Sequence, residues 1–369
     1  MQRLYEAMAI WGNPSSAHQF GRKALEFMEE SRRIVASKLA VAPSEVVFTS
    51  GGSEANTLAL WGASLSVPNF RLLVSTVEHS SVIDTAKLLQ SQGVTVQWAP
   101  VTRSGELDLE RFDELLGSFQ PHLVSVMTAN NETGVVFPIP LIAKRCHERG
   151  ILLHTDAVQA LGKLPASHWK DADFISVTAH KIGGPKGVGA LAVKRGKKLV
   201  STHYGGSQET KRRGGTQNTI GIAGFAGACE GVCEFTGKEA PNYYFERALK
   251  SALTDFTISA ELAPRLPTTT NVRFHGIPAE VLLSAFDLEG LCVSAGSACS
   301  SGSISPSHVL TAMGLSTPEA KEALRFSWGS QTTMAEIDRA VTLVIDHVRR
   351  IRERRRQKEN RAELITTHA

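Results

Sequence analysis

Polar residues that could bind or react with a small molecule follow several apolar, β-branched runs of the sequence. Gly52 and Ser53 follow VVFTS (46–50), and Asp156 lies near the end of ILLHTDA (151–157). Lys181 lies 25 residues after Asp156, behind FISVTA (174–179). A carboxylate that ends an apolar strand is costly to bury unless a cation meets it. A glycine-rich turn that opens a helix offers backbone N–H groups to a phosphate.

An aspartate, a lysine and a phosphate-binding turn at one site are what pyridoxal phosphate (PLP) requires. The lysine forms a Schiff base with the cofactor, and the aspartate keeps the pyridine nitrogen protonated so that the ring accepts electrons. The phosphate could be met by the turn together with Ser53, Thr178 and His180, and His79 could stack on the ring. Each residue alone has an ordinary alternative: Ser53 could be a helix N-cap, and His79 a polar group with a structural partner.

The elements around these residues predict how they come together. Apolar runs at 46–50, 71–76, 94–98, 123–129, 151–157, 174–179 and 189–193 alternate with helical patterns such as 80–93 and 139–150. This alternation predicts a mainly parallel sheet sandwiched by helices, an α/β fold. A Gly/Pro-rich loop without a helix joins the last two runs, so one of them could run antiparallel. Ligands bind beyond the carboxyl ends of parallel strands, which places at one edge Ser53, His79, Asn131, Asp156, Gln159, Thr178, His180 and Lys181.

The pattern changes near Gly237, where we expect a smaller α+β domain to begin. We assign residues 13–237 to a large PLP-binding domain, and residues 1–12 and 238–369 to the small domain, with a strand at 268–274 and a helix at 279–290. The net charge of +4 on 369 residues is too small to indicate nucleic acid or a membrane as partner. We interpret the basic stretch 347–361 as a solvated helix, because no aromatic residues interleave its charges.

One of the five cysteines lies in an unusual setting. Cys299 is part of VSAGSACSSGS (293–303), a run of small residues that offers it no core to pack against. The odd number of cysteines favours free thiols in a reducing, cytoplasmic protein. Cys229 and Cys233 lie one helical turn apart, which without a second ligand pair is a weak metal signal, so no metal site is expected. Cys292 is expected to be buried.

Several long stretches resemble the cysteine desulfurases, which are PLP-dependent enzymes of fold type I in the class V aminotransferase superfamily. The resemblance is to the branch that serves iron–sulfur cluster assembly and nitrogenase maturation, and it runs from about residue 2 to about residue 350. The stretches that carry it are GNPSSAHQFG (12–21), VVFTSGGSEAN (46–56), NNETGVVFPI (130–139), HTDAVQALGK (154–163), SVTAHKIGGPKGVGAL (176–191), QETKRRGGTQN (208–218) and SAGSACSSGSISPSHVLTAMG (294–314).

The resemblance implies a role for each candidate residue. Lys181 would be the Schiff-base lysine, Asp156 the pyridinium partner, and Gln159 a donor to the phenolic oxygen of PLP. The phosphate would be bound by the turn at Gly52, by Ser53, Thr178 and His180, and by Thr216 of a neighbouring subunit, which implies a homodimer. His79 would stack on the ring and transfer protons. Asn131, beside the cofactor, and Arg325 would hold the substrate carboxylate; without the resemblance, Arg325 would be read as a surface salt bridge.

For Cys299 the resemblance implies a nucleophile that takes the sulfur of L-cysteine as a persulfide and leaves L-alanine. The sulfur would pass to an acceptor protein such as an iron–sulfur scaffold. The alternatives are a selenocysteine lyase or another PLP-dependent C–S lyase, neither of which need depend on Cys299. A non-catalytic family member is a further alternative, since the chain starts at MQRLYEAM, after the first strand and turn usual in the family. GGPKGVG (183–189) lacks the ending of a nucleotide-binding loop, which disfavours such a protein.

Overall fold

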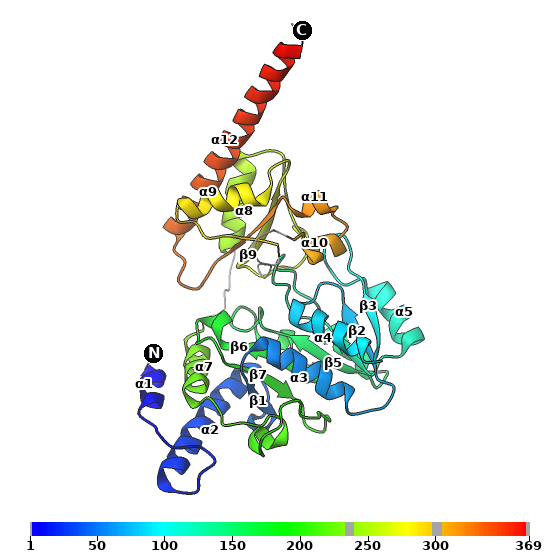
Figure 1. The fold of residues 1–369 in the computed structure, drawn as a ribbon, viewed down its shortest axis with the longest axis vertical. Coiled ribbons are helices and arrows are strands. Elements are labelled where there is room, and N and C mark those ends of the chain that lie inside the picture. The colour runs from blue at the N-terminus through cyan, green and yellow to red at the C-terminus, as the bar shows by residue number, and fades with distance from the viewer. Residues whose placement is uncertain (1, 233–239, 297–304, 367–369) are drawn as a thin grey trace. The chain divides into compact units, whose positions relative to one another are not determined.

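The chain forms two compact units. The computed structural model describes residues 2–232, 240–296 and 305–366, with side chains as far as residue 360. Unit 1 comprises Met1–Thr102, Glu106–Asn130 and Val136–Glu234, and unit 2 comprises Arg103–Gly105, Asn131–Val135 and Phe235–Ala369. Figure 1 shows their helices and strands, and the labels in it number the elements in chain order.

Unit 1 contains seven strands and most of the helices that the alternating pattern predicted. Its helices are α1 (Gln2–Met8), α2 (Gln19–Leu39), α3 (Gly52–Ser64), α4 (Ser80–Ser91), α5 (Leu109–Phe119), α6 (Ile139–His147) and α7 (Thr219–Gly231), with short 3₁₀ turns η1 (Pro43–Glu45), η2 (Ala166–His168), η3 (Ala179–Ile182) and η4 (Gln208–Lys211). Its strands are β1 (Val46–Thr49), β2 (Arg71–Ser75), β3 (Thr95–Ala99), β4 (Leu123–Ser125), β5 (Leu152–Asp156), β6 (Phe174–Thr178) and β7 (Gly189–Val193).

These strands form one sheet in the order β1-β7-β6-β5-β4-β2-β3. β7 is antiparallel to both of its neighbours, β1 and β6, whereas the pairs from β6 to β3 are parallel. The expected mainly parallel sheet is therefore confirmed, and β7 is the antiparallel strand of the last pair. β1 consequently runs in the same direction as β6 and β5, so that the carboxyl ends of all three lie at one edge.

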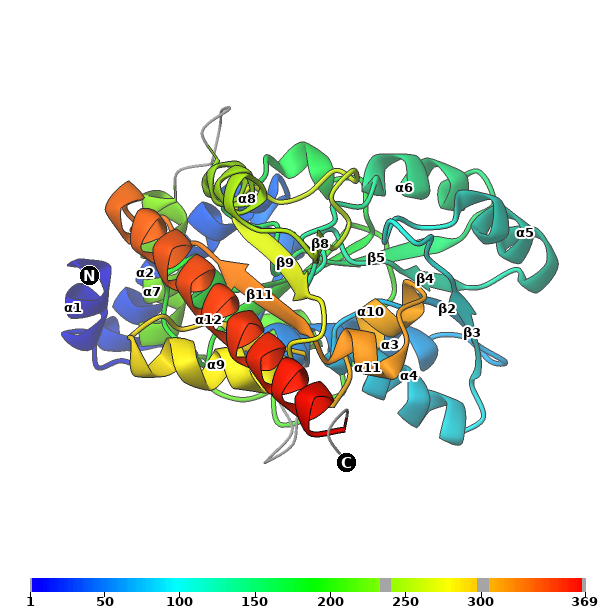
Figure 2. The ribbon, with the colours of Figure 1, turned by 90° about the horizontal axis from the view of Figure 1, so that it is seen from above.

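Helices cover both faces of this sheet. Figure 2 shows α3 and α4 on one face and α6 on the other. Leu58 and Leu60 of α3 and Val82 of α4 pack with strand residues such as Leu72 and Leu123 in a core that excludes water. Apart from the edge strand β3, the strands are almost wholly buried, as their unbroken apolar sequences predicted. This burial fixes the sheet edge at which the polar residues emerge.

Two details of unit 1 differ from the sequence-based expectation. β4 ends at Ser125 rather than near residue 129: Val126 and Thr128 still donate to carbonyl oxygens of β5, but the N–H of Met127 donates to Glu78 Oε1 and not to a strand. Residues 1–12 were grouped with the smaller domain, whereas α1 belongs to unit 1. Arg3 explains this placement, since it forms ion pairs with Glu30 at 3.1 Å and Glu230 at 2.8 Å.

Unit 2 is the expected smaller α+β unit. Its four-stranded sheet has the order β10-β11-β9-β8 with antiparallel pairs throughout. Phe245, Phe286 and Val344, from three different helices, pack on strand residues such as Phe274 and Phe326. The elements are α8 (Pro241–Ala252), β8 (Phe256–Ile258), β9 (Thr269–Phe274), α9 (Ala279–Leu288), β10 (Ser294–Ala295), α10 (His308–Ala312), α11 (Thr317–Ala320), β11 (Ala323–Ser327) and α12 (Met334–Thr366).

The basic stretch expected to be a solvated helix lies in α12. Three of its arginines contact the rest of unit 2: Arg349 donates to the carbonyl oxygen of Ala252 at 2.8 Å, Arg352 to that of Thr254 at 2.7 Å, and Arg355 to that of Gly276. The following residues to Asn360 are exposed. Among the helices of the described ranges, none combines the length and the apolar character that a membrane span requires.

Candidate active site

Nine of the predicted site residues lie in unit 1. Asp156 and Thr178 are the last residues of β5 and β6, and Thr216 lies on a loop before α7. The other six lie on segments that follow the carboxyl ends of β1, β2, β5 and β6: Gly52, Ser53, His79, Gln159, His180 and Lys181. Because these four strands run in one direction, the segments leave the sheet at the same edge. The remaining described pair, Asn131 and Arg325, belongs to unit 2.

The glycine turn between β1 and α3 packs closely on the neighbouring strands. Gly189 of β7 pairs with Thr49 on one side and Thr178 on the other. A Cβ on Gly189 would lie 2.6 Å from the carbonyl oxygen of Val177 and 2.7 Å from the carbonyl carbon of Gly51. Only glycine allows this approach, since such distances are far inside van der Waals contact. The turn is therefore held against the end of β6.

The start of α3 has backbone N–H groups that a side chain does not cap. The helix begins at Gly52, and its N-cap is Gly51, which supplies no side-chain hydrogen bond. The alternative in which Ser53 caps the helix is therefore wrong, and the exposed Ser53 lies in the first turn. Uncapped N–H groups and the positive end of the helix dipole attract an anion. Glu54, one residue on, accepts a hydrogen bond from the N–H of Ser50 at 2.7 Å and so closes the turn.

Asp156 is a buried carboxylate with neutral hydrogen-bond donors. Its side chain accepts from Asn56 Nδ2 at 2.7 Å and from the N–H of Val158 at 2.9 Å, and the residue is 4% exposed. Burial raises the pKa of Asp156, while these two bonds and the positive charge of Lys181 act in the opposite direction. A protonated pyridine nitrogen would supply a cation to this carboxylate, so the residues present fit PLP.

A hydrogen-bond network that the sequence did not predict connects Asp156 to His79. Asn56 Nδ2 also donates to Ser81 Oγ at 2.9 Å, and Ser81 Oγ lies 2.8 Å from His79 Nδ1. The N–H of Ser81 donates to the same Nδ1 at 3.1 Å, which makes His79 the N-cap of α4. A backbone N–H can only donate, so Nδ1 is an acceptor and the proton of the neutral ring is on Nε2. Proton exchange with a ligand would therefore use the Nε2 edge of His79.

Thr178 and His180 are joined at the end of β6. Thr178 Oγ1 donates to the carbonyl oxygen of Val188 at 3.1 Å and lies 3.0 Å from His180 Nδ1. Because the hydroxyl proton points to a carbonyl, the Nδ1–H of His180 is the donor to Oγ1. Burial, followed by the charges of Lys181 and Lys186, lowers the pKa of His180, which favours the neutral ring. In this arrangement neither side chain has a proton left to donate to a phosphate, so the Thr178 hydroxyl would have to turn away from Val188 to bind one. The positive charge here comes from the exposed Lys181.

Gln159 and Thr216 complete the residues of unit 1. Gln159 is half-buried, and its Oε1 accepts from Lys163 Nζ at 2.8 Å, which turns the amide so that Nε2 is the remaining donor. Thr216 is exposed and lines a cavity of about 130 Å³ together with Ser50 and Gly187. Its exposure leaves the hydroxyl accessible to another molecule.

Arg325 of unit 2 is not the surface salt bridge that its sequence context alone would suggest. It lies on β11, and its Nη1 donates to the carbonyl oxygen of Asn131 at 2.8 Å. Burial lowers the pKa of Arg325, and the charge of Glu132 opposes this shift. The Nε atom is buried without a hydrogen-bond partner. A buried donor in this state is costly unless a ligand satisfies it, which suits an anion such as a carboxylate.

The cysteines divide into buried and exposed thiols. Burial raises the pKa of both Cys146 and Cys229 to about 12, so these thiols are unreactive. Cys292 is exposed, contrary to the expectation, because it lies in the connection between α9 and β10 rather than within a strand. Cys233 and Cys299 lie outside the described residues. Within the described ranges, no group of three or more His, Cys, Asp or Glu residues is placed to hold a metal ion.

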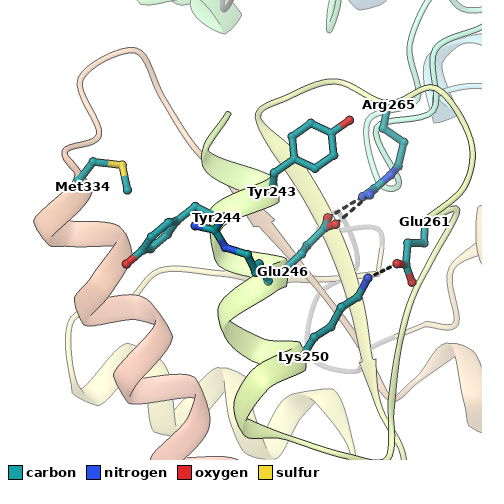
Figure 3. Close-up of a pocket in the computed structure, with 8 residues that line it drawn as sticks. Tyr243, Tyr244, Glu246, Lys250, Glu261, Arg265 and Met334 are labelled. Atoms are coloured by element: carbon teal, nitrogen blue, oxygen red, sulfur yellow. Dashed lines mark hydrogen bonds and ion pairs between the residues drawn. The ribbon is translucent and has the colours of Figure 1, made fainter. Parts of the chain in front are cut away.

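Unit 2 also contains a cavity of about 650 Å³ that none of the predicted residues lines. Figure 3 shows that four of its charged side chains form two ion pairs: Arg265 with Glu246, and Lys250 with Glu261. Its lining is therefore largely self-neutralising, in contrast to the buried carboxylate of unit 1.

Comparisons with known proteins agree with this geometry. The pattern of the class-V aminotransferase family matches residues 1–340. The chain is 41% identical over 349 residues to a cysteine desulfurase of Nostoc sp. (strain PCC 7120), covering 93% of this chain and 87% of the relative. It is 37% identical over 350 residues to cysteine desulfurase IscS of Dictyoglomus turgidum, covering 91% of this chain and 89% of that protein.

The fold agrees as well. A solved NifS-like protein superimposes with a TM-score of 0.84 and 31% sequence identity, covering 94% of this chain and 95% of the other. The expected fold of a PLP-dependent transferase is thereby confirmed. The chain belongs to the class-V aminotransferase family and, within it, to the PLP-dependent cysteine desulfurases.

Proposed function

We propose that this protein converts L-cysteine to L-alanine and retains the sulfur as a persulfide on Cys299. The C–S bond of the substrate breaks, and the sulfur bonds to the Cys299 thiolate. The electron pair of the broken bond stays on the Cβ of the substrate, which takes up a proton, equivalent to the one that the Cys299 thiol lost, and becomes the methyl group of alanine. No external oxidant or reductant is needed, because the sulfur atom that the thiol gains is lost by the substrate, whose carbon keeps the electron pair of the C–S bond.

The observation that carries this proposal is the environment of Asp156. A carboxylate that is buried at the end of β5 and bonded to neutral donors is suited to a bound cation of fixed position. PLP, when bound, withdraws electrons from the substrate α-carbon through its protonated ring nitrogen. Asp156 would hold that nitrogen protonated, and Lys181 would attach the cofactor covalently.

The other residues of unit 1 would orient the cofactor. Gln159 Nε2 would donate to the phenolic oxygen, and His79 would stack on the ring while exchanging protons at Nε2. The N-terminal turn of α3 would bind the phosphate. The residues assigned to this phosphate are Gly52, Ser53, Thr178, His180 and, from a second subunit, Thr216.

Substrate binding would fall to unit 2. Arg325 would use its unpartnered Nε and one Nη to bind the carboxylate of cysteine in a bidentate manner. The bond from Arg325 to the carbonyl oxygen of Asn131 would fix the guanidinium, and the Asn131 side chain would contact the bound substrate and cofactor. The persulfide on Cys299 would then be handed to an acceptor protein, such as an iron–sulfur scaffold.

Two parts of the proposal concern the state of the protein in the cell. The exposed Thr216 supports a homodimer in which each subunit completes the phosphate site of the other. The free thiols Cys146, Cys229 and Cys292 support a reducing compartment, which we take to be the cytoplasm.

The decisive experiment follows alanine and sulfur separately. The purified protein, loaded with PLP, is given L-cysteine without reductant, and the persulfide is located by alkylation and peptide mass spectrometry. We expect the extra sulfur on Cys299 and about one alanine per subunit in the first turnover. Cys292→Ala is the matched control, because Cys292 is an exposed thiol of the same unit and its loss leaves both products unchanged.

The variants Cys299→Ala and Lys181→Ala test the two covalent roles. Cys299→Ala should still bind PLP but form neither persulfide nor alanine, whereas Lys181→Ala should lose the visible absorbance of the lysine-bound cofactor. Sustained alanine formation by Cys299→Ala would refute the persulfide route. Turnover of selenocysteine alone by that variant would instead identify a selenocysteine lyase.

A further inference from the structure

The loop before Thr216 has an unusual backbone. Three successive residues with side chains, Glu209, Thr210 and Lys211, have φ angles of 47°, 57° and 63°. This left-handed conformation is unfavourable for residues with a Cβ atom and normally occurs at single positions. A run of three persists only where surrounding contacts hold it. The segment therefore requires an anchor.

The anchor is the carboxylate of Glu209, whose side chain is 1% exposed. It accepts from both terminal nitrogens of Arg32 at 2.8 Å and from the N–H of Phe48 at 2.9 Å. Arg32 also donates to the carbonyl oxygen of Val46 at 2.8 Å and lies over the Phe48 ring, 4.7 Å from its centroid. Glu209 is thus fixed to β1, the strand that leads into the glycine turn.

A second contact joins the same loop to α3. Arg213 Nε donates to Glu54 Oε1 at 2.9 Å, and the other oxygen of Glu54 accepts the N–H of Ser50. The loop is therefore tied to the residues on both sides of the glycine turn. These two attachments limit movement of the loop relative to the glycine turn and the first turn of α3, where we propose that the phosphate binds.

Glu209 is also connected to the neighbour of Thr216. Gln217 Nε2 donates to Glu209 Oε1 at 3.2 Å, and Gln208 Oε1 accepts from the N–H of Gly215, also at 3.2 Å. Contacts from the anchored segment thus flank Thr216 on both sides in the sequence. The hydroxyl-bearing residue itself remains exposed beside the cavity of about 130 Å³.

We infer that Glu209 and Arg32 are positioning residues that set where Thr216 is presented to the cofactor phosphate. The inference rests on the proposed role of Thr216. Glu209 and Arg32 do not themselves contact the cofactor in this assignment; they act through the backbone of the loop. A buried ion pair is weak support for stability in general, because well-packed apolar residues often serve as well. The bidentate geometry of the Arg32–Glu209 pair, and the left-handed segment that this pair holds in place, point instead to a role in orienting the loop that carries Thr216.

Unit 2 offers a matched ion pair that is not attached to the glycine turn. Arg265 donates to both oxygens of Glu246 at 2.7 and 2.9 Å, their side chains are 4% and 6% exposed, and Thr270 Oγ1 donates to the same carboxylate. Figure 3 shows this pair beside the cavity of unit 2. Glu246→Gln and Glu209→Gln therefore remove the same charge from similar buried surroundings.

The test compares PLP affinity and stability in these two variants. Apo-protein is titrated with PLP, and the thermal midpoint of each apo-variant is recorded. We expect both variants to lose stability, but only Glu209→Gln to bind PLP about tenfold more weakly, the loss expected for one misplaced hydrogen bond to a charged phosphate. If Glu209→Gln does not fold, Arg32→Lys serves instead, since it keeps the charge but not the bidentate pair.

Thr216→Val and the double variant separate positioning from general loosening. If Glu209 acts through Thr216, Glu209→Gln should have little further effect on PLP affinity in the Thr216→Val background. Fully additive effects, or equal PLP affinity in Glu209→Gln and Glu246→Gln, would overturn the inference. If Thr216→Val alone leaves PLP affinity unchanged, Thr216 does not bind the phosphate, and the inference that Glu209 positions it is also overturned. Failure of the parent protein to bind PLP would instead refute the proposed function.

Discussion

The protonation of His154 gives a prediction whose size follows from the structure. His154 lies on β5 and is fully buried between two hydroxyl groups: Ser125 Oγ on β4, 2.8 Å from Nδ1, and Ser176 Oγ on β6, 2.9 Å from Nε2. Burial lowers its pKa to about 3. The neutral ring is satisfied by hydroxyl groups, whereas an imidazolium would be buried without a counter-charge.

The sign of the effect follows from proton linkage. Below a pH of about 6.5 the unfolded chain binds a proton at this histidine that the folded protein does not bind. Stability is therefore lost as pH falls through this range. Taking a folded pKa of about 3, one proton per chain over 1.5 pH units gives a loss of about 2 kcal/mol between pH 7.5 and pH 5.0.

The assay is guanidinium unfolding of the apo-protein at pH 7.5 and 5.0, with the variant His154→Gln measured in parallel. Trp61, Trp98 and Trp169 report on unit 1 by fluorescence. The glutamine can bond to both serines but does not titrate, so the variant should lose about 2 kcal/mol less than the parent between the two pH values. Contributions of all other groups cancel in this difference.

A control and an independent readout make the result decisive. His203→Gln, the same exchange at an exposed position, records what a histidine-to-glutamine replacement does by itself. In NMR spectra of selectively labelled protein, the His154 ring carbon should not titrate between pH 8 and 5. An equal pH dependence in the parent and in His154→Gln, or titration of this carbon near pH 6.5, would refute the reasoning.

Three further predictions concern the site and its support. Gly189→Ala should destabilise the apo-protein by about 1–3 kcal/mol in chemical unfolding, because its Cβ would meet backbone atoms at 2.6 and 2.7 Å. Gly117→Ala in α5, where no atom lies within 4 Å, should instead stabilise it by about 0.5–1 kcal/mol; the reverse order would contradict the close packing of the turn. Asn56→Leu removes a hydrogen bond that lowers the pKa of Asp156, so the acidic limb of the PLP affinity profile should move to higher pH, and an unchanged profile would count against that bond. Arg325→Lys should raise the KM for L-cysteine about tenfold while PLP affinity is retained, and an unaltered KM would exclude Arg325 from carboxylate binding.

The sheet and the edge that carries the site could be predicted from local pattern. Short apolar runs separated by helical patterns identify buried parallel strands, and the carboxyl ends of such strands share an edge. Asp156 and Lys181 were therefore assigned to one site without knowledge of the fold. The antiparallel direction of β7 could be anticipated in part, since no crossover helix precedes it.

Other contacts could not be predicted, because they join side chains that are distant in the sequence. Asn56 lies inside α3, and nothing in its neighbours indicates that its amide meets Asp156, 100 residues later. Arg32 and Glu209 are 177 residues apart, and neither stands out in its local sequence. The bond from the N–H of Met127 to Glu78 Oε1, just after β4, is a further example, because it joins residues 49 positions apart.

Local sequence patterns were sufficient to predict the succession of strands and helices along the chain, the residue types at the sheet edge and the family. Periodicity and strand ends are properties of neighbouring residues, which is why they can be read in this way. The folded structure was needed to find which donors bind Asp156, which nitrogen of His79 carries the proton, and how the left-handed segment at Glu209 is anchored. Those outcomes depend on burial, which makes each unpaired polar atom costly and so selects one set of partners among many that the sequence permits.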